Sequence, residues 1–146
     1  MSFRLVRCDR DGVPIELVPN MPDALVANCT ASVELYRRIG FAEPWVSYVA
    51  VDSGNGVGGG AFVGPPSENC VEIAYFTLKE HEGRGYATST VSALIEIARR
   101  HAPQVTLKAF TLREHNASTR ILQRHGFHYF GDAHDPDAGA VWEWRV

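Results

Sequence analysis

The sequence predicts an α/β fold, and three observations carry that prediction. Residues 71–78 form an apolar, β-favouring run that contains one acidic residue, Glu72. A loop with Gly83 and Gly85 follows this run, and from Ala87 the apolar residues recur at helical spacing. The rest of the chain alternates strand-like and helical patterns, which is typical of a sheet with helices packed against it.

Each element of this prediction rests on a local pattern. Strands are predicted where short apolar runs are bounded by turn residues: 3–8, 13–18, 45–51, 57–63, 71–78, 105–112, 127–130 and 140–145. Helices are predicted at 23–39, 87–101 and 116–125. Gly40 and Gly126 are placed to end the first and the last helix. The glycines in 57–63 would let another backbone or a ligand come close.

Composition limits the kind of protein. A length of 146 residues suits one domain, here residues 1–146. The net charge of −3 gives no global basic field, so nucleic acid is not an expected partner. No apolar run reaches the length of a membrane span and no secretory signal is seen, so no membrane partner is expected. The three scattered cysteines suit reduced thiols, which favours a cytoplasmic protein.

The glycine loop has the character of an anion site. Glycines leading into a helix start present free N–H groups and the positive end of the helix dipole, and phosphate is the usual occupant. A P-loop would end in Gly-Lys-Ser/Thr, whereas this loop ends in Gly85-Tyr86-Ala87. A dinucleotide fingerprint would need a third small residue where Thr88 stands.

Two motifs resemble the GNAT superfamily of acetyl-CoA-dependent N-acetyltransferases. Residues 82–87, Glu-Gly-Arg-Gly-Tyr-Ala, are similar to its pyrophosphate loop, Gln/Arg-x-x-Gly-x-Gly/Ala, with Glu82 in place of the Gln or Arg. The segment Asn116-x-Ser118-x-Arg120, followed by Gly126-Phe127, is similar to the branch that acetylates the N-termini of ribosomal proteins.

The resemblance implies the GNAT fold, with a mixed, mostly antiparallel central sheet flanked by helices on both faces. It implies an N-acetyltransferase, an acyltransferase that moves an acetyl group from acetyl-CoA to a primary amine by direct attack. Loop amides and Arg84 would hold the pyrophosphate, while strand residues and Asn116 would hold the pantetheine arm. The implied cofactor-binding residues are Phe76, Thr77, Leu78, Gly83, Arg84, Gly85, Tyr86, Ala87, Thr88 and Asn116.

Catalytic roles follow from the same resemblance and from side-chain chemistry. Glu72 is the best-placed carboxylate to take a proton from the acceptor amine. Many GNAT enzymes carry a tyrosine at the leaving thiolate, but Leu122 stands at that position. Ser118 is therefore expected to donate a hydrogen bond to the sulfur. Tyrosines 36, 75 and 86 remain alternatives for this role.

Several points stay open. A catalytically weak or inactive acyl-CoA-binding or regulatory domain of the same fold is the alternative function, favoured by Leu122 and Glu82. The acceptor is a small-molecule or peptide amine that the sequence does not identify, and a homodimer is left open. The acidic turn at 132–137 is read as a solvated loop, so no metal is expected.

Overall fold

The computed structural model describes residues 2–146, which fold as one seven-stranded sheet with three α-helices. The strands are β1 (Phe3–Arg7), β2 (Ser47–Asp52), β3 (Asn55–Phe62), β4 (Cys70–Thr77), β5 (Thr106–Leu112), β6 (His128–Asp135) and β7 (Gly139–Arg145). They lie in the order β1-β2-β3-β4-β5-β7-β6. Every neighbouring pair is antiparallel except β4 and β5, which are parallel. The predicted mixed, mostly antiparallel sheet is confirmed.

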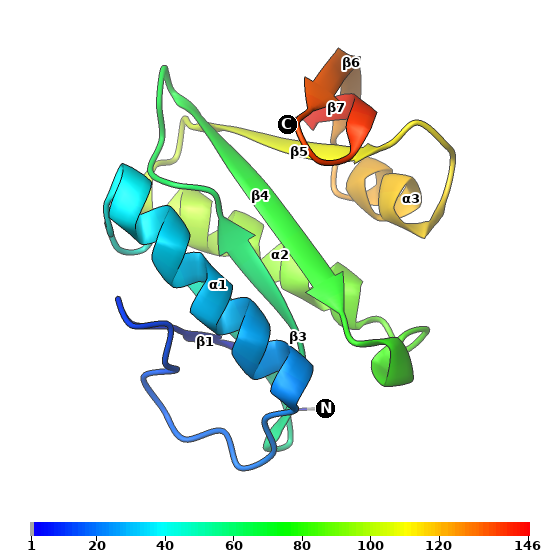
Figure 1. Ribbon diagram of the computed structural model, residues 1–146. Helices are drawn as coiled ribbons and strands as arrows, with labels where there is room; N and C mark the ends of the chain where they lie inside the picture. Colours follow the sequence, from blue (N-terminus) through cyan, green and yellow to red (C-terminus); the bar gives the residue numbers. More distant parts are fainter. Residues whose placement is uncertain (1) are drawn as a thin grey trace.

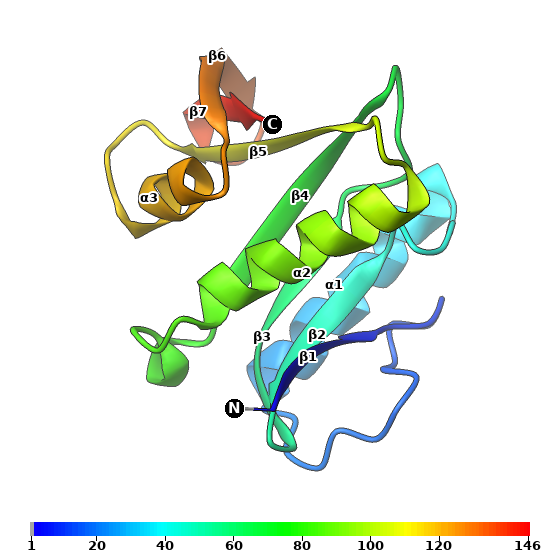
Figure 2. The ribbon, with the colours of Figure 1, turned by 180° about the vertical axis from the view of Figure 1, so that it is seen from behind.

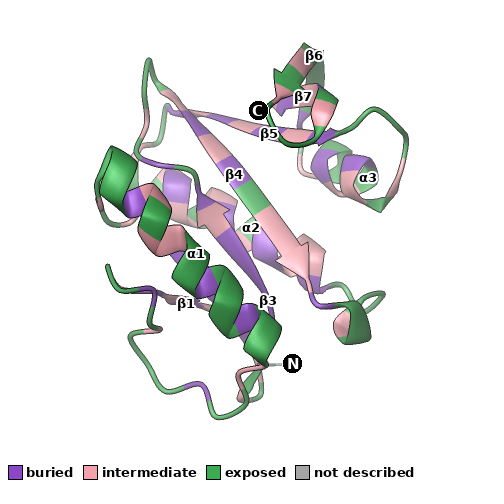
Figure 3. Cartoon of the chain, viewed as in Figure 1, coloured by how far each residue is buried: buried purple, intermediate pink, exposed green. Residues whose placement is uncertain are grey.

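Helices cover both faces of this sheet, as predicted. Helix α1 (Asp23–Ile39) lies across one face and α2 (Tyr86–His101) across the other (Figures 1 and 2). Leu25, Cys29 and Tyr36 of α1 are buried, and their spacing of four and seven residues places them on one helix face. The outer surface of α1 is exposed (Figure 3). Gly40 has a φ of 87° and its N–H bonds the carbonyl of Tyr36, so it ends the helix as expected.

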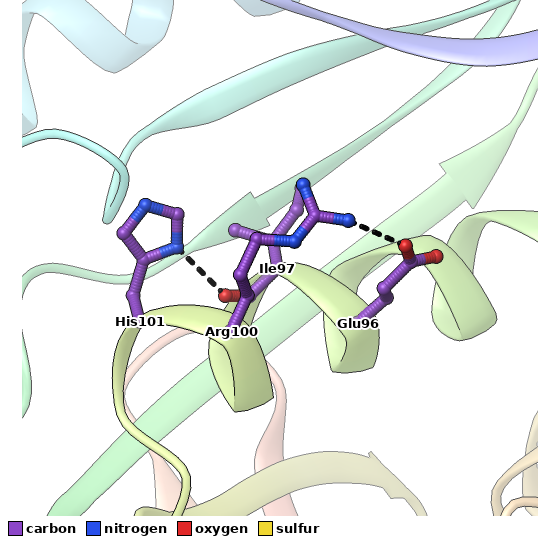
Figure 4. A network of polar contacts seen from close by, with 4 residues as sticks. All are labelled: Glu96, Ile97, Arg100 and His101. Carbon is purple, nitrogen blue, oxygen red and sulfur yellow. Dashed lines mark hydrogen bonds and ion pairs between the residues drawn. The ribbon is translucent and has the colours of Figure 1, made fainter.

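Helix α2 packs through the stripe that its sequence predicts. Val91, Leu94 and Ala98 are fully buried against the sheet. The opposite side carries polar contacts near the helix end, where Arg100 Nη2 lies 2.6 Å from Glu96 Oε1 (Figure 4). His101 Nδ1 lies 3.0 Å from the carbonyl oxygen of Ile97. The basic residues sit at the negative end of the helix dipole, where they stabilise the helix.

Strand β3 has no side chains at the positions where its neighbours come closest. A β-carbon at Gly60 would lie 2.7 Å from Thr90 Cγ2 and 3.0 Å from Leu94 Cδ1, so α2 occupies that volume. A β-carbon at Gly59, on the other face, would lie 2.8 Å from the ring of Phe76. The close approach expected at this glycine-rich strand is therefore made by side chains of α2 and β4.

The sheet opens between β4 and β5. Pairing covers only Cys70–Glu72 with Thr106–Lys108, after which the two strands diverge (Figures 1 and 2). The short helix α3 (Ala117–Arg124) follows β5 and makes contact with α2. In the middle of β4, Ala74 is exposed, because no helix covers it at this point.

Two details of the predicted elements are wrong. Residues 13–18 form no strand, and their alternating apolar side chains Val13, Ile15 and Leu17 are 54%, 52% and 84% exposed. The final hairpin is longer than predicted, because β6 continues through residues 131–135 that the sequence assigns to a turn. Among residues 2–146 there is no helix that is both long and apolar enough to cross a membrane.

Candidate active site

A cavity of about 600 Å³ lies where β4 and β5 separate. Its walls come from the end of β4, from the loop before α2 and the first turn of α2, and from one face of α3. The lining residues are Tyr75, Phe76, Thr77, His81, Glu82, Gly83, Gly85, Tyr86, Ala87, Thr88, Ala117, Ser118, Arg120, Ile121 and Arg124. This volume is in the range of pockets that hold small-molecule ligands.

The loop before α2 presents its backbone to the cavity. Gly83 and Gly85 have φ values of 78° and 84°, which glycine adopts without steric cost. A β-carbon at either position would meet nothing within 4 Å, so the space beside the loop is open. No side chain of the described residues caps the start of α2. The first N–H groups of this helix are therefore available to an anion, and the helix dipole favours one.

The edge of β4 that faces the opening carries backbone groups without a strand partner. Val63 N–H donates to Glu72 O, and Leu78 N–H donates to Val57 O, so even-numbered residues of β4 bond β3. Backbone direction alternates along a strand, so the N–H and C=O groups of Tyr75 and Thr77 point toward β5. Because β5 has diverged there, these groups can pair with an extended ligand.

Tyr75 and Ser118 meet across the cavity. The hydroxyl of Tyr75 lies 2.8 Å from that of Ser118, joining β4 to α3. Burial is the main cause that raises the pKa of Tyr75 above its usual value of 10, so the phenol is neutral at pH 7. The other two candidate tyrosines are engaged elsewhere: Tyr36 accepts a bond from Ser47 N–H at 2.9 Å, and Tyr86 donates to Asp52 at 2.6 Å.

Asn116 fixes the start of α3. Its Oδ1 accepts from Thr119 N–H at 3.0 Å, while Thr119 Oγ1 accepts from Asn116 N–H at 2.9 Å. Its Nδ2 donates to Glu114 at 3.3 Å. This capping box occupies the amide that the sequence assigns to the pantetheine arm. Asn116 therefore positions Ser118, two residues further along, by setting where the helix begins.

Glu72 lies on the opposite face of β4 from Tyr75. It shares that face with Ala74 and Phe76, and Phe76 packs toward α1. Within the described chain Glu72 forms no ion pair, and no hydrogen bond to its carboxylate shifts its pKa. Burial raises its pKa above the usual 4.5, while the charge of Lys108 acts in the other direction.

Comparison of the sequence with known families identifies the family of this protein. The sequence model of the family described as "Acetyltransferase (GNAT) domain" matches residues 17–128. The chain belongs to the GNAT acetyltransferase family. The expectations of this superfamily, of its fold and of an N-acetyltransferase are thereby confirmed.

Solved structures share the fold of this GNAT acetyltransferase at low identity. RimL, a ribosomal L7/L12 α-N-protein acetyltransferase solved with coenzyme A, has a TM-score of 0.71 and 16% identity, covering 99% of this chain and 93% of its own. The IAA acetyltransferase from Bacillus cereus has a TM-score of 0.71 and 15% identity, covering 99% of both chains. YncA from Salmonella typhimurium, solved with its cofactor acetyl-CoA, has a TM-score of 0.66 and 16% identity, covering 100% of this chain and 94% of its own. A search of curated proteins finds no match.

The predicted site residues of this GNAT acetyltransferase divide into two groups. Those that line the cavity are Phe76, Thr77, Gly83, Gly85, Tyr86, Ala87, Thr88 and Ser118. Those outside its lining are Glu72, Leu78, Arg84 and Asn116. Leu78 is buried and its N–H is bonded to β3, whereas Arg84 is exposed beside the loop.

Two arginines of the cavity lining were missed by sequence reasoning. Arg120 and Arg124 lie on the face of α3 that lines the cavity and bring two positive charges to it. A signal for them exists, because Ala117, Arg120, Ile121 and Arg124 follow the i, i+3, i+4, i+7 spacing of one helix face. Leu122, which stands at the position of the expected tyrosine, is fully buried and does not line the cavity. The described residues contain no group of three side chains that could hold a metal ion.

Proposed function

We propose that this GNAT acetyltransferase transfers an acetyl group from acetyl-CoA to a primary amine by direct attack. One observation carries the proposal: a Tyr75–Ser118 hydroxyl pair lies on one face of the sheet at the opening between β4 and β5, and Glu72, which forms no ion pair within residues 2–146, lies on the other face next to that opening. The hydroxyls suit a leaving sulfur and the carboxylate suits an incoming amine. The two reactants would approach each other through the opening from opposite sides of the sheet.

The cavity residues fit acetyl-CoA as the second substrate, which supplies an acetyl group activated as a thioester. The backbone amides of Gly83, Gly85 and the first turn of α2 would bind the pyrophosphate. The guanidinium groups of Arg120 and Arg124 would balance phosphate charge and offset the carboxylate of Glu82. The free backbone groups of Tyr75 and Thr77 would pair with the pantetheine arm.

Glu72 would act as the general base. Its raised pKa makes it a stronger base than an exposed glutamate, and no protein cation neutralises it by direct contact. The nitrogen–carbon bond forms as the carbon–sulfur bond breaks. The acceptor ammonium loses one proton to Glu72, which passes it to solvent, and its second proton leaves on the thiol of CoA.

Tyr75 and Ser118 would act together at the sulfur. In a pair of hydroxyls 2.8 Å apart, one donates to the other and leaves the second hydrogen free to point into the cavity. Charge develops on the sulfur only as the thioester breaks, so this hydrogen bond would be stronger in the transition state than in the ground state.

Turnover tests the proposal directly. Acetyl-CoA should release free CoA when it is mixed with the protein and a panel of primary amines, and the acetylated amine should be detected by mass spectrometry. The rival function, an inactive acyl-CoA-binding domain, predicts thermal stabilisation by acetyl-CoA with no CoA release for any amine.

Ser118→Ala and Tyr75→Phe should each lower kcat by roughly 10- to 100-fold, because each removes one hydroxyl of the pair. The dissociation constant of acetyl-CoA should stay close to that of the wild type. The double variant should lose little more than either single one, since the two groups act as a unit. Ser2→Ala, at an exposed serine outside the cavity lining, is the matched control. Wild-type rates in both single variants would show that the sulfur departs without side-chain help.

A further inference from the structure

A second cavity, of about 290 Å³, lies on the α1 side of the sheet at the point where β4 and β5 begin to separate. Glu72 lines it, together with Lys108 and Arg145 from the neighbouring strands and Ser67 from the loop before β4. Two residues along a strand are about 6.6 Å apart, so this cavity adjoins the opening at the exposed Ala74.

The cavity holds two opposite charges that do not neutralise each other by contact. Glu72 and Lys108 are direct partners in the parallel ladder, and adjacent strands lie only about 4.8 Å apart. Even so, neither side chain forms an ion pair within residues 2–146. The ammonium of Lys108 lies 5.7 Å from the centre of the Phe110 ring.

Arg145 is paired through its Nε, whereas Lys108 forms no ion pair within residues 2–146. The Nε of Arg145 lies 2.5 Å from Glu143, and its guanidinium lies 3.7 Å from the centre of the Phe130 ring. A ligand in the cavity therefore meets the Glu72 carboxylate and the Lys108 ammonium side by side, and neither forms an ion pair within residues 2–146. A second carboxylate, Glu68, lines the cavity from the loop before β4 and is exposed to solvent.

We propose that the acceptor is an amine that carries its own carboxylate close by, a zwitterion such as a free α-amino acid, with its ammonium on Glu72 and its carboxylate on Lys108. This rests on the proposed function. In a free α-amino acid the ammonium and the carboxylate are attached to the same carbon. They can therefore contact Glu72 and Lys108, which are direct neighbours on adjacent strands. The N-terminus of a protein lacks that carboxylate, and a polyamine would bring a second positive charge against Lys108.

The test compares free α-amino acids with their carboxamides, which keep the amine and the side chain and lose only the carboxylate. For the wild type, kcat/KM should be about 10- to 100-fold higher for the free acid, as expected for one charge-assisted contact. Lys108→Met keeps the length of the side chain without its charge, and should reduce this ratio to near one, mainly by loss on the free acid. Lys79→Met, at an exposed lysine outside the cavity lining, should keep the ratio of the wild type.

Two results would overturn the assignment: equal kcat/KM for acids and amides in the wild type, or the same proportional loss for both in Lys108→Met. Calorimetry of the amino acid and its amide, with CoA present, separates this proposal from the proposed function. Selective binding of the acid that depends on Lys108, without any CoA release, would keep the zwitterion site and contradict the acetyltransferase. If the protein shows neither selective binding nor selective turnover of the free acid, but still acetylates amines, only the zwitterion site is contradicted.

Discussion

Glu72→Gln should lower turnover by about 100-fold near neutral pH, because glutamine keeps the shape of the side chain but cannot accept the proton of the acceptor ammonium. The dissociation constant of acetyl-CoA should hardly change, since Glu72 lies outside the lining of the cofactor cavity. Rates of CoA release and a binding titration on the same variant give both quantities. Glu34→Gln, at an exposed glutamate of α1, is the matched control.

The pH dependence adds a second signature of Glu72. The charged side chains that face it are Glu68, Lys108, Asp135, Glu143 and Arg145. Burial is the largest influence on Glu72 and raises its pKa above 4.5. The rate should therefore fall, on acidification, at a higher pH than the pKa of an ordinary glutamate would give. Glu72→Gln should lack that fall.

Stability follows from the same shift. The folded protein holds the Glu72 proton more tightly than the unfolded chain does, so this group favours folding below pH 4.5, and its contribution falls as pH rises through the folded pKa. At neutral pH the buried charge opposes folding. Glu72→Gln should therefore unfold at the same temperature as the wild type or higher.

A Glu72→Gln variant with full activity would show that another group or water takes the proton. A strongly lowered Tm of this variant would point to a structural role for Glu72.

Gly85→Asp should abolish the stabilisation of the protein by acetyl-CoA. At a ligand concentration 100 times Kd, binding stabilises the wild type by about 2.7 kcal/mol, which for a chain of this length raises Tm by roughly 5–10 °C. The substitution places a carboxylate where the loop presents its amides to the cavity. Because nothing lies within 4 Å of a β-carbon at this position, the variant should still fold.

Gly139→Asp is the matched control for this experiment. Gly139 has a φ of 79° against 84° at Gly85, and a β-carbon there would also meet nothing within 4 Å. It lies at the start of β7, outside the lining of the cofactor cavity. Both variants should lose similar intrinsic stability from the strained backbone, while only Gly85→Asp should lose the response to acetyl-CoA. An unchanged response in Gly85→Asp would place the cofactor elsewhere.

The fold was largely predictable because most elements carry a strong local signal. Helix α1 begins and ends where the apolar spacing and Gly40 predict. The segment 13–18 was wrongly predicted as a strand because its apolar residues alternate as they do in a strand. In the structure its only strand-like pairing among the described residues is an isolated bridge between Cys8 and Pro14, and Val13, Ile15 and Leu17 are exposed. Pro14 lacks the N–H needed to extend the ladder.

The site was predictable only where it is continuous in sequence. The glycine loop and Ser118 each lie within a recognisable motif, and both line the candidate cavity between β4 and β5. The contact between Tyr75 and Ser118 joins residues 43 positions apart, and nothing in the sequence singles Tyr75 out from the other tyrosines. Lys108 beside Glu72 depends on the register of a parallel pair, which the pattern of apolar residues does not specify.

The close packing at Gly60 should couple three positions across relatives of this fold. Thr90 and Leu94 fill the volume that a larger residue at position 60 would need. Both belong to α2, the helix that begins directly after the glycine loop. Across relatives of this fold, a side chain at the equivalent of Gly60 should occur together with a smaller residue at the equivalent of Thr90 or Leu94. Relatives that carry large residues at all three positions would contradict this coupling. The distance from α2 to the sheet would then be set by other residues.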